Sequence, residues 1–92
     1  MGRSLVHDNA AQEDLVEVWL YTFHTWSVEQ ADRYLGLLER GINTIGREPE
    51  AGKSREELRA RYWSKHIEHH VVFYTFTDHE VRIRRVLHEV MD

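Results

Sequence analysis

The spacing of apolar residues changes once along this chain, and the change restricts the folds open to it. Between residues 9 and 47, apolar side chains recur three and four positions apart, which is typical of amphipathic helices. From about residue 60, apolar and polar side chains alternate instead, as they do in strands. Because 92 residues hold one modest hydrophobic core, we expect a single domain over residues 1–92.

Two capping-box patterns predict where the helices begin. Asn9 is followed by Gln12, and Ser27 by Gln30, so each pair can satisfy free amides of a first helical turn. The first apolar stripe ends near residues 25–26, and so short a connection to the second cap predicts an antiparallel helical hairpin. The residues expected to form the two stripes are Leu15, Val18, Trp19, Thr22, Phe23 and Trp26, then Val28, Ala31, Tyr34, Leu35, Leu38, Ile42 and Ile45.

A polar connector follows the second helix. Gly46 in a left-handed cap, followed by Pro49, is expected to end that helix. Residues 49–58 are polar, and a small capping box at Ser54 and Glu57 predicts a single helical turn within them.

Four segments have the composition of strands. The third of them is apolar on both faces, with Val71 and Phe73 on one side and Val72, Tyr74 and Phe76 on the other, so we expect it to be central. The predicted fold class is α+β with the order β-α-α-β-β-β, a helical hairpin packed on a small antiparallel sheet. The strands are expected at residues 3–7, 60–67, 69–77 and 80–88.

Alternation also assigns faces in the last strand. Leu87 falls in step with Val81 and Ile83, whereas Arg82, Arg84 and His88 share the other face. Because this strand continues to the end of the sequence without a Gly or Pro tail, we expect its final residues to be anchored in the sheet.

Charge and composition exclude several kinds of protein. The formal net charge of −4 argues against a general nucleic-acid binder, so no direct sequence-specific DNA binding is expected. The sequence contains no cysteine, no apolar run long enough for a membrane span and no signal-peptide pattern, so we expect a cytoplasmic protein without membrane association. Basic residues concentrate in the C-terminal third, where an anionic target would bind: Arg59, Arg61, Lys65, Arg82, Arg84 and Arg85.

Four segments, in this order, resemble the ParE toxins of the RelE/ParE toxin–antitoxin superfamily. They are AAQEDLVEVWLYTFHTWSVEQADRYLGLLE (10–39), with its W-[GS]-V-x-Q-A helix break, REPEAGKSREELR (47–59) with its ExG connector, HVVFY (70–74) and RVLHEVMD (85–92). The resemblance covers nearly the whole chain. It implies a type II toxin, not itself an enzyme, that is neutralised in a hetero-oligomer by a ParD-like antitoxin, a ribbon-helix-helix protein with a disordered tail. The free toxin would poison DNA gyrase by protein–protein binding.

The resemblance also indicates target-facing residues. Arg85, His88 and Met91 match the R-V-L-H-x-x-M-D pattern, in the region where toxicity is commonly placed, and we add Arg82 and Arg84 of the same strand. The chain departs from the family pattern at three places. Family sequences often read Gly-Arg where this one has Glu68-His69 and Glu89-Val90, and position 84 is usually apolar.

Two other functions stay open at this point. A RelE-type, ribosome-dependent mRNA interferase needs a base, an acid and a phosphate-binding cation. Its candidates here are Arg61, Lys65, His66, Arg82, Arg84 and His88, although the VMD ending lacks the basic or aromatic cluster usual in that branch. A diverged, non-toxic member that only binds its antitoxin is the third possibility.

No cofactor and no metal are expected. His66, His69 and His70 could suggest a metal site, but alternation puts His69 and His70 on opposite faces of a strand.

A sheet covered on one face by one hairpin leaves apolar surface open to a partner. The predicted antitoxin-binding residues are Trp63, Val72, Tyr74 and Phe76, with an edge strand as a second docking place.

Overall fold

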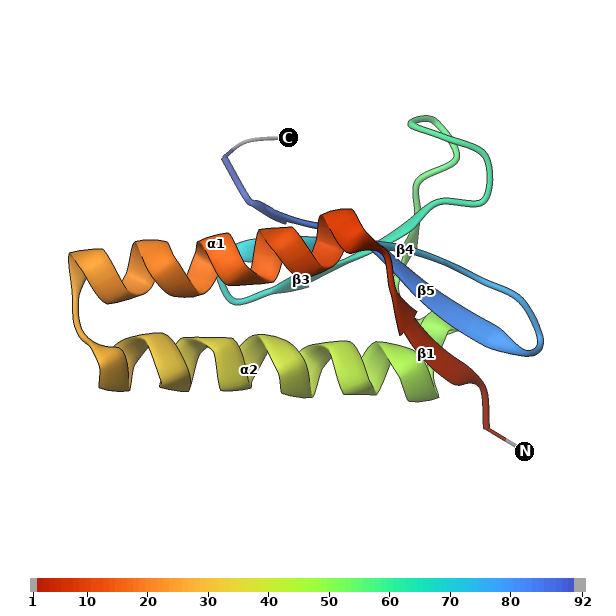
Figure 1. The fold of residues 1–92 in the computed structure, drawn as a ribbon. Coiled ribbons are helices and arrows are strands. Elements are labelled where there is room, and N and C mark those ends of the chain that lie inside the picture. Colours follow the sequence, from red (N-terminus) through yellow and green to blue (C-terminus); the bar gives the residue numbers. More distant parts are fainter. Residues whose placement is uncertain (1, 91–92) are drawn as a thin grey trace.

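The computed structural model describes residues 2–90 as two helices lying on one face of a five-stranded mixed sheet (Figure 1). The predicted α+β class, with a helical hairpin on a small sheet, is confirmed. The short strand in the connector was not expected, and the helical turn predicted to start at Ser54 lies earlier, as a 3-10 turn at Pro49–Ala51. The elements are β1 (Ser4–His7), α1 (Asn9–Thr25), α2 (Val28–Arg47), η1 (Pro49–Ala51), β2 (Lys53–Ser54), β3 (Trp63–Ile67), β4 (His70–Phe76) and β5 (Glu80–His88).

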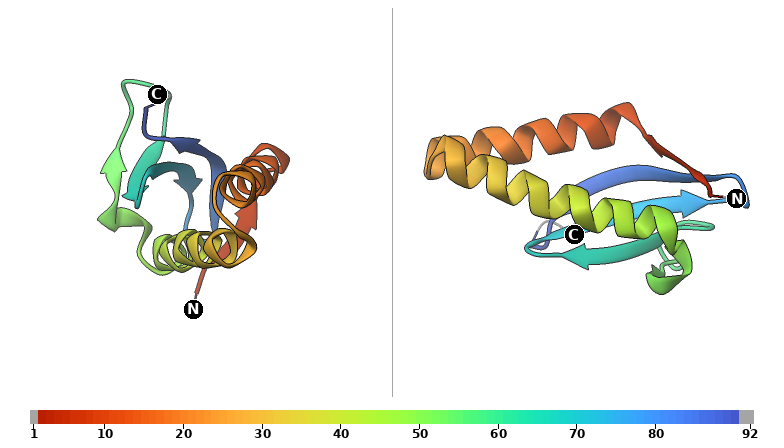
Figure 2. Two further views of the ribbon diagram at one scale, coloured as in Figure 1. Left: turned by 90° about the vertical axis from the view of Figure 1, so that its left-hand side faces the viewer. Right: turned by 90° about the horizontal axis from the view of Figure 1, so that it is seen from below.

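The strands lie side by side in the order β1-β5-β4-β3-β2, so β4 is central, as its two apolar faces predict. All neighbouring pairs are antiparallel except β1 and β5, which run parallel with Leu5 opposite Val81. The helical hairpin provides the crossover that a parallel pair requires. Viewed along the helices, the sheet curves around α2 (Figure 2). Helix α1 packs against α2 and β5.

The helix ends follow the predicted caps only in part. The Oγ of Ser27 accepts a hydrogen bond from the backbone N–H of Gln30 at 3.1 Å, which confirms the start of α2. The prediction for α1 was wrong by one residue, because Asp8 occupies the N-cap position without a side-chain cap. The prediction for Gly46 was also wrong. Helix α2 continues to Arg47, and no glycine among residues 2–90 has a positive φ.

Apolar side chains of both helices and the sheet form one core, in which each large buried side chain contributes about 1.5–3 kcal/mol to stability. The Tyr74 hydroxyl donates a hydrogen bond to the carbonyl oxygen of Pro49 at 2.6 Å, and this bond ties η1 to the centre of the sheet. Gly52 lies so close to β3 that a Cβ there would be 2.8 Å from the Ser64 carbonyl oxygen. The core residues are Ala11, Leu38, Ile42, Ile45, Val72, Tyr74, Val81, Ile83 and Val86.

A β-bulge changes which residues of β5 face the helices. Phe73 is opposite Arg85 but Tyr74 is opposite Ile83, so Arg84 is the extra residue of the bulge. Because side chains alternate with a period of two, one extra residue exchanges the faces of all residues that follow it. The predicted faces of Leu87 and His88 were therefore wrong. Val86, at 2% exposure, continues the buried row instead of Leu87.

The opposite face of the sheet is less open than predicted. Val71 and Phe73, at 8% and 5% exposure, are buried there. Two side chains of the connector pack over Phe73, with the Tyr62 ring centroid at 6.3 Å and the Arg55 guanidinium at 6.0 Å from the phenyl ring. The connector therefore covers much of the face that the sequence left exposed.

Candidate protein-interaction surfaces

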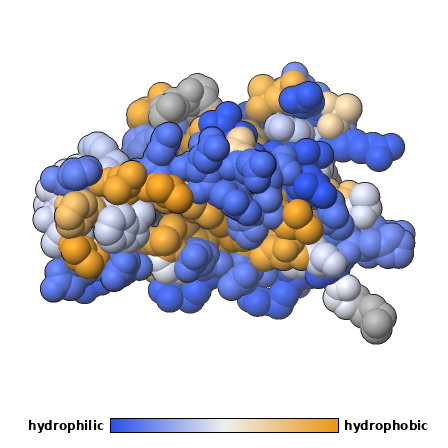
Figure 3. Space-filling view, viewed as in Figure 1, coloured by the Kyte–Doolittle hydropathy of each residue, from blue (hydrophilic) through white to orange (hydrophobic). Residues whose placement is uncertain are grey.

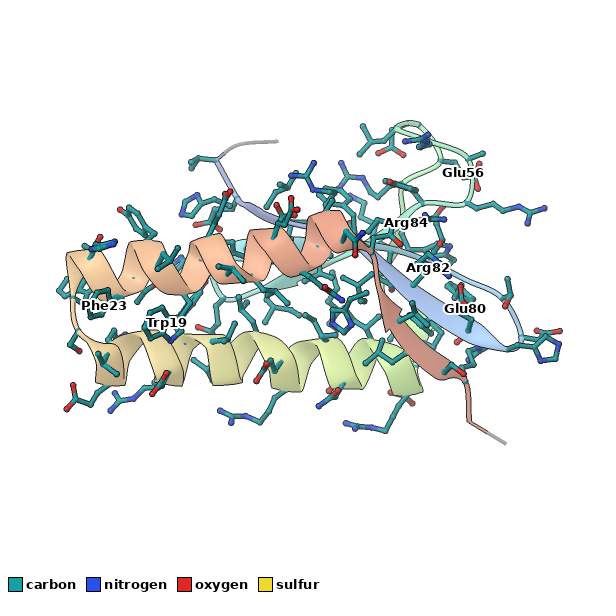
Figure 4. All side chains as sticks on the ribbon, in the orientation of Figure 1. Trp19, Phe23, Glu56, Glu80, Arg82 and Arg84 are labelled. Atoms are coloured by element: carbon teal, nitrogen blue, oxygen red, sulfur yellow. The ribbon has the colours of Figure 1, made fainter. Side chains whose placement is uncertain are left out.

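Three arginines of β5, Arg82, Arg84 and Arg85, were predicted to face a target, and we call them the arginine cluster. Arg82 and Arg84 share the Asp8 carboxylate: their Nη1 atoms are 2.9 and 3.0 Å from its two oxygens. Arg82 also binds Glu80 through Nε at 2.9 Å. In Figure 4 the labelled side chains of Glu80, Arg82 and Arg84 lie along β5, and the two arginines are near the start of α1. Asp8 thus brings together two of the three guanidinium groups of the arginine cluster, those of Arg82 and Arg84.

These ion pairs shift the pKa values of Asp8 and Arg82. The hydrogen bond from Arg82, followed by that from Arg84, holds the pKa of Asp8 below its ordinary value although burial opposes it. The same bond raises the pKa of Arg82. The side chains of Arg82 and Arg84 nevertheless keep 34% and 38% exposure. They are held in place while remaining accessible to a partner.

Arg85 is bound differently, by a residue in the interior of α1. Its Nε and Nη2 donate to the Asp14 carboxylate at 2.8 and 3.0 Å, and the backbone N–H of Val86 donates to the same group at 2.9 Å. The side-chain hydrogen bond to Asp14 raises the pKa of Arg85. The pairing of β1 with β5 runs only to Ile83, so Asp14 supplies an acceptor to β5 past the end of β1.

The two remaining target-facing candidates are not part of this surface. His88 lies on the helix side of the sheet, where its ring meets that of His70 edge to face with centroids 5.2 Å apart. Met91 lies outside the described residues. The structure therefore brings together two of the five predicted residues, Arg82 and Arg84, whereas Arg85 binds Asp14.

His66 of β3 and His69 of the β3–β4 turn bind Glu89, which directly follows β5, an interaction that alternation did not predict. Both oxygens of Glu89 accept hydrogen bonds, one from His66 Nε2 at 2.7 Å and one from His69 Nδ1 at 3.2 Å. The bond from His69, with a smaller contribution from His66, lowers the pKa of Glu89. Glu89 and His69 are both positions at which the chain departs from the ParE pattern, and these two departures are in contact.

His70 is a buried histidine with a specific partner. Its Nδ1 is 2.7 Å from the Tyr34 hydroxyl, whose oxygen accepts the His69 backbone N–H at 3.0 Å. Burial, reinforced by His88 and His69, lowers the pKa of His70 to about 4, so the ring is neutral near pH 7. Among residues 2–90, no three His, Asp or Glu side chains form a group that could hold a metal ion.

The predicted antitoxin-binding residues divide into two pairs. Val72 and Tyr74 are fully buried beneath the helices, so their assignment to a free surface was wrong. They belong to the face that the hairpin covers. Trp63 and Phe76 are partly buried at the margin of the core, with ring centroids 5.3 Å apart. Arg3 lies over Phe76 at 5.4 Å from its ring centroid.

Larger apolar surface is exposed on the helical hairpin. Trp26 is 72% exposed and Phe23 is 37% exposed, although their place in the first apolar stripe predicted that both lie in the core. In Figure 3, hydrophobic residues form a band from the α1–α2 turn along the line between the helices. The sequence did contain a signal for this surface. Helix α1 has three further large apolar residues outside its core stripe, at Val16, Leu20 and Tyr21.

The candidates for RNA cleavage do not converge. Lys65 lies opposite Val72 and His88 faces His70, so both belong to the helix side of the sheet. Arg82 and Arg84 lie on the opposite side, bound to Asp8. The connector residue Arg61 is exposed, and its backbone N–H donates to Glu56 at 2.8 Å. His66 is bound to Glu89.

Solved structures with this arrangement of elements define the class of fold. A structure described as a chromosomal ParDE toxin–antitoxin system from P. aeruginosa matches with a TM-score of 0.83 and 15% identity, covering 94% of this chain and 95% of that one. The toxin–antitoxin complex RelBE2 from Mycobacterium tuberculosis gives a TM-score of 0.67 and 24% identity, covering 96% and 99%. The fold is that of small toxins in such complexes.

Sequence comparison identifies the family within this class. The family model described as the ParE toxin of the type II toxin–antitoxin system parDE matches residues 5–92. Toxin ParE1 from Mycobacterium tuberculosis is 36% identical over 84 residues, which cover 90% of this chain and 86% of the relative. Toxin ParE1 from Caulobacter vibrioides is 40% identical over 82 residues, covering 89% and 84%. The chain belongs to the ParE toxin family of type II toxin–antitoxin systems.

Proposed function

We propose that this chain is a toxin that an antitoxin neutralises by binding to its helical hairpin. The observation that carries the proposal is the exposed apolar surface of α1, where Val16, Leu20 and Phe23 are 58%, 43% and 37% exposed. Contiguous apolar surface of this kind marks a partner site in a soluble protein. Family membership supports a ParD-like partner with a ribbon-helix-helix domain and a tail that becomes ordered on binding.

The proposed target is DNA gyrase, bound in the cytoplasm without chemistry by the toxin. Arg82 and Arg84 are fixed by Asp8 and stay about one third exposed, which suits the binding of an acidic or phosphate-bearing surface. Bound arginines also lose less conformational entropy on association than free ones. The separation of His88 and Lys65 from Arg82 and Arg84 across the sheet favours binding over RNA cleavage.

Purified protein and gyrase with plasmid DNA test the target. We expect the protein to inhibit supercoiling and to increase the amount of cleaved DNA. Absence of both effects would contradict the gyrase assignment. Transcripts cut within translated frames after induction would then favour the mRNA interferase. Unimpaired growth after induction without antitoxin would favour a diverged member that only binds its partner.

Co-expression tests the partner. A neighbouring reading frame that encodes a ribbon-helix-helix protein should co-purify with this chain and restore growth. Leu20→Asp introduces a charge on the exposed apolar surface and should reduce co-purification, whereas Leu58→Asp makes the same change in the connector, at 55% exposure, and is the matched control. Equal recovery of the antitoxin with both variants would place its binding site elsewhere.

A further inference from the structure

A cavity of about 440 Å³ lies between the middle of α1 and the last residues of β5. Strand β1 pairs with β5 only as far as Ile83, so within residues 2–90 no strand fills the space beside Val86 and His88. In Figure 1, this end of β5 continues past β1 alongside α1. We call the space the His70 cavity, after the residue that β4 contributes to its lining.

The His70 cavity is separate from the surface proposed for the antitoxin. Val16, Leu20 and Phe23, whose exposure carries that proposal, do not line it. The ion pair of Asp14 and Arg85 forms part of its wall instead. A ligand of this cavity would therefore be additional to the antitoxin and independent of the proposed function.

His70 holds a fixed tautomer at this cavity. The residue is 9% exposed, and its Nδ1 is 2.7 Å from the Tyr34 hydroxyl. Because the oxygen of that hydroxyl already accepts the backbone N–H of His69, its own proton is donated to Nδ1. A neutral imidazole carries one proton, so Nε2 of His70 is an N–H donor.

This Nε2–H group has no acceptor among residues 2–90. Every fully buried side-chain nitrogen and oxygen in that range does have a hydrogen-bond partner, so Nε2 must reach open space, and the space that His70 lines is the cavity. His88 lies edge to face with it, with ring centroids 5.2 Å apart. The Nδ1 of His88 accepts the backbone N–H of Val90 at 3.3 Å, which leaves Nε2 to carry the proton of the neutral ring. Two adjacent imidazole rings thus supply donors to the lining.

The acceptors of the lining are largely used by the protein itself. The Asp14 carboxylate accepts three N–H groups, two from Arg85 and one from the backbone of Val86. The Thr22 hydroxyl donates to the carbonyl oxygen of Val18 at 2.8 Å, within α1. A ligand that accepts hydrogen bonds is therefore favoured over one that donates them.

Charge decides between a neutral and an anionic acceptor. Asp14 and Glu17 both line the cavity, and Arg85 compensates the first of them. The charge of Glu17 remains, so an anionic ligand would be repelled while a neutral carbonyl group would not.

We propose that the His70 cavity binds a small neutral molecule with a carbonyl acceptor and an apolar ring. The carbonyl oxygen accepts from Nε2 of His70 and His88, and the ring packs against Val18 and Tyr21 of the cavity wall. The volume lies in the range of roughly 300–1,000 Å³ that is usual for small-molecule sites. Specificity comes from the buried donors, because a ligand without the acceptor leaves them unpaired. The bound molecule joins α1 to the end of β5.

Two ligands of the same shape test the chemical class. Phenylacetamide and phenylacetate share a ring and a carbonyl group and differ in charge. In an NMR titration, the amide should produce saturable shifts at residues 18–22 and 86–90, and it should bind about tenfold more tightly than the acid. The proposal is overturned if the amide gives no saturable shift up to its solubility limit, or if the acid binds equally well.

The protonation of His70 gives a readout that does not depend on affinity. Nitrogen NMR of the imidazole rings at pH 7 should show the proton of His70 on Nε2, and this resonance should move when phenylacetamide is added. A proton on Nδ1 instead would remove the proposed donor and contradict the site.

Variants locate the site. His88→Phe keeps an aromatic ring but removes a donor, and should weaken binding of phenylacetamide roughly fivefold. His79→Phe makes the same change in the exposed β4–β5 turn and should leave binding unchanged. Glu17→Gln removes the uncompensated charge and should narrow the difference between amide and acid. Unaltered binding in both His88→Phe and Glu17→Gln, with folding confirmed by circular dichroism, would place the ligand elsewhere.

The proposed function is tested separately. Leu20→Asp, which probes the antitoxin surface, should leave binding of phenylacetamide unchanged, because Leu20 does not line the His70 cavity. Failure of the antitoxin to co-purify counts against the proposed function alone, and failure of the amide to bind counts against the His70 cavity alone.

Discussion

Asp14 on α1 and Arg85 on β5 form a bidentate ion pair, in which Nε and Nη2 of the arginine are 2.8 and 3.0 Å from the carboxylate oxygens. The same carboxylate accepts the backbone N–H of Val86, and its side chain is only 11% exposed. Helix α1 is thereby attached to β5 in the region that β1 does not reach. One carboxylate thus joins the helical layer to the strand that carries the arginine cluster.

Replacement of Asp14 should destabilise the protein more than an ordinary surface substitution. Asp14→Ala leaves the Val86 N–H without its acceptor and Arg85 without its counter-charge, so we expect the free energy of unfolding to fall by about 2–4 kcal/mol. Asp14→Asn retains an acceptor oxygen and should cost less. Urea denaturation measures both. Glu17→Ala, an exposed change on the same helix, is the control, and an equally large effect there would contradict this role of Asp14.

Tyr74 should connect the core to the 3-10 turn through a single hydrogen bond. Tyr74→Phe removes the donor to Pro49 while keeping the ring, and should lower the free energy of unfolding by about 1–2 kcal/mol. Amide hydrogen exchange in residues 50–55 should become faster. Tyr21→Phe, at a 70% exposed position, is the matched control for loss of a phenol hydroxyl. Unchanged exchange in the connector would show that other contacts hold it.

The burial of neutral His70 should make stability depend on pH. Its pKa is lowered from 6.5 to about 4, so the unfolded chain binds a proton more readily than the folded one. Stability from this group is complete above pH 6.5 and is lost as pH falls toward 4, by an amount on the order of 2–3 kcal/mol. The groups facing it are Tyr34, His69, His88 and Glu89.

His70→Asn tests this pH dependence, because an amide oxygen can still accept from Tyr34 but does not titrate. Urea midpoints measured between pH 7 and pH 4.5 should fall less steeply for the variant than for the unaltered chain. His24→Asn, at an exposed position of α1, controls for the substitution itself. The carboxylates with lowered pKa values, Asp8 and Glu89, lose their contribution at lower pH, as it falls through their folded values. Parallel curves for all three proteins would contradict the assignment to His70.

Local signals predicted most of the fold, and contacts between distant residues explain the errors. The cap of α2 was predicted correctly because the two residues that form it, Ser27 and Gln30, are only three positions apart in the sequence. At α1 the predicted cap, Asn9, was wrong by one residue, because Asp8 is the N-cap residue and its side chain binds Arg82, 74 residues away in the chain. Alternation placed β4 correctly but could not reveal the bulge at Arg84, since a bulge is a property of the pairing between two strands.

The same reasoning applies to the candidate surfaces. Arg82, Arg84 and Arg85 were identified because charge and family pattern are read along the sequence. Their acidic partners were not identified, because Asp8 and Asp14 reach them only in three dimensions. The exposure of Trp26 and Phe23 was not predicted, because helical spacing alone does not show how far the neighbouring layer extends along the helix. The sheet covers one side of the helical hairpin and leaves the other side open (Figure 2).

Arg84 should separate folding from the proposed inhibition of gyrase. Its position is usually apolar in the family pattern, and its guanidinium is 38% exposed while bound to Asp8. Arg84→Gln removes the charge but keeps an N–H donor at the position of Arg84 Nε, which donates to Thr75 Oγ1 at 3.2 Å, so little change in the urea midpoint is expected. At least tenfold more protein should be needed for half-maximal inhibition of supercoiling, because the charge facing the target is lost. Lys65→Gln removes a charge on the helix side of the sheet and is the control. Full inhibitory activity of Arg84→Gln, with a loss in Lys65→Gln instead, would place the gyrase-binding surface on the opposite face of the sheet.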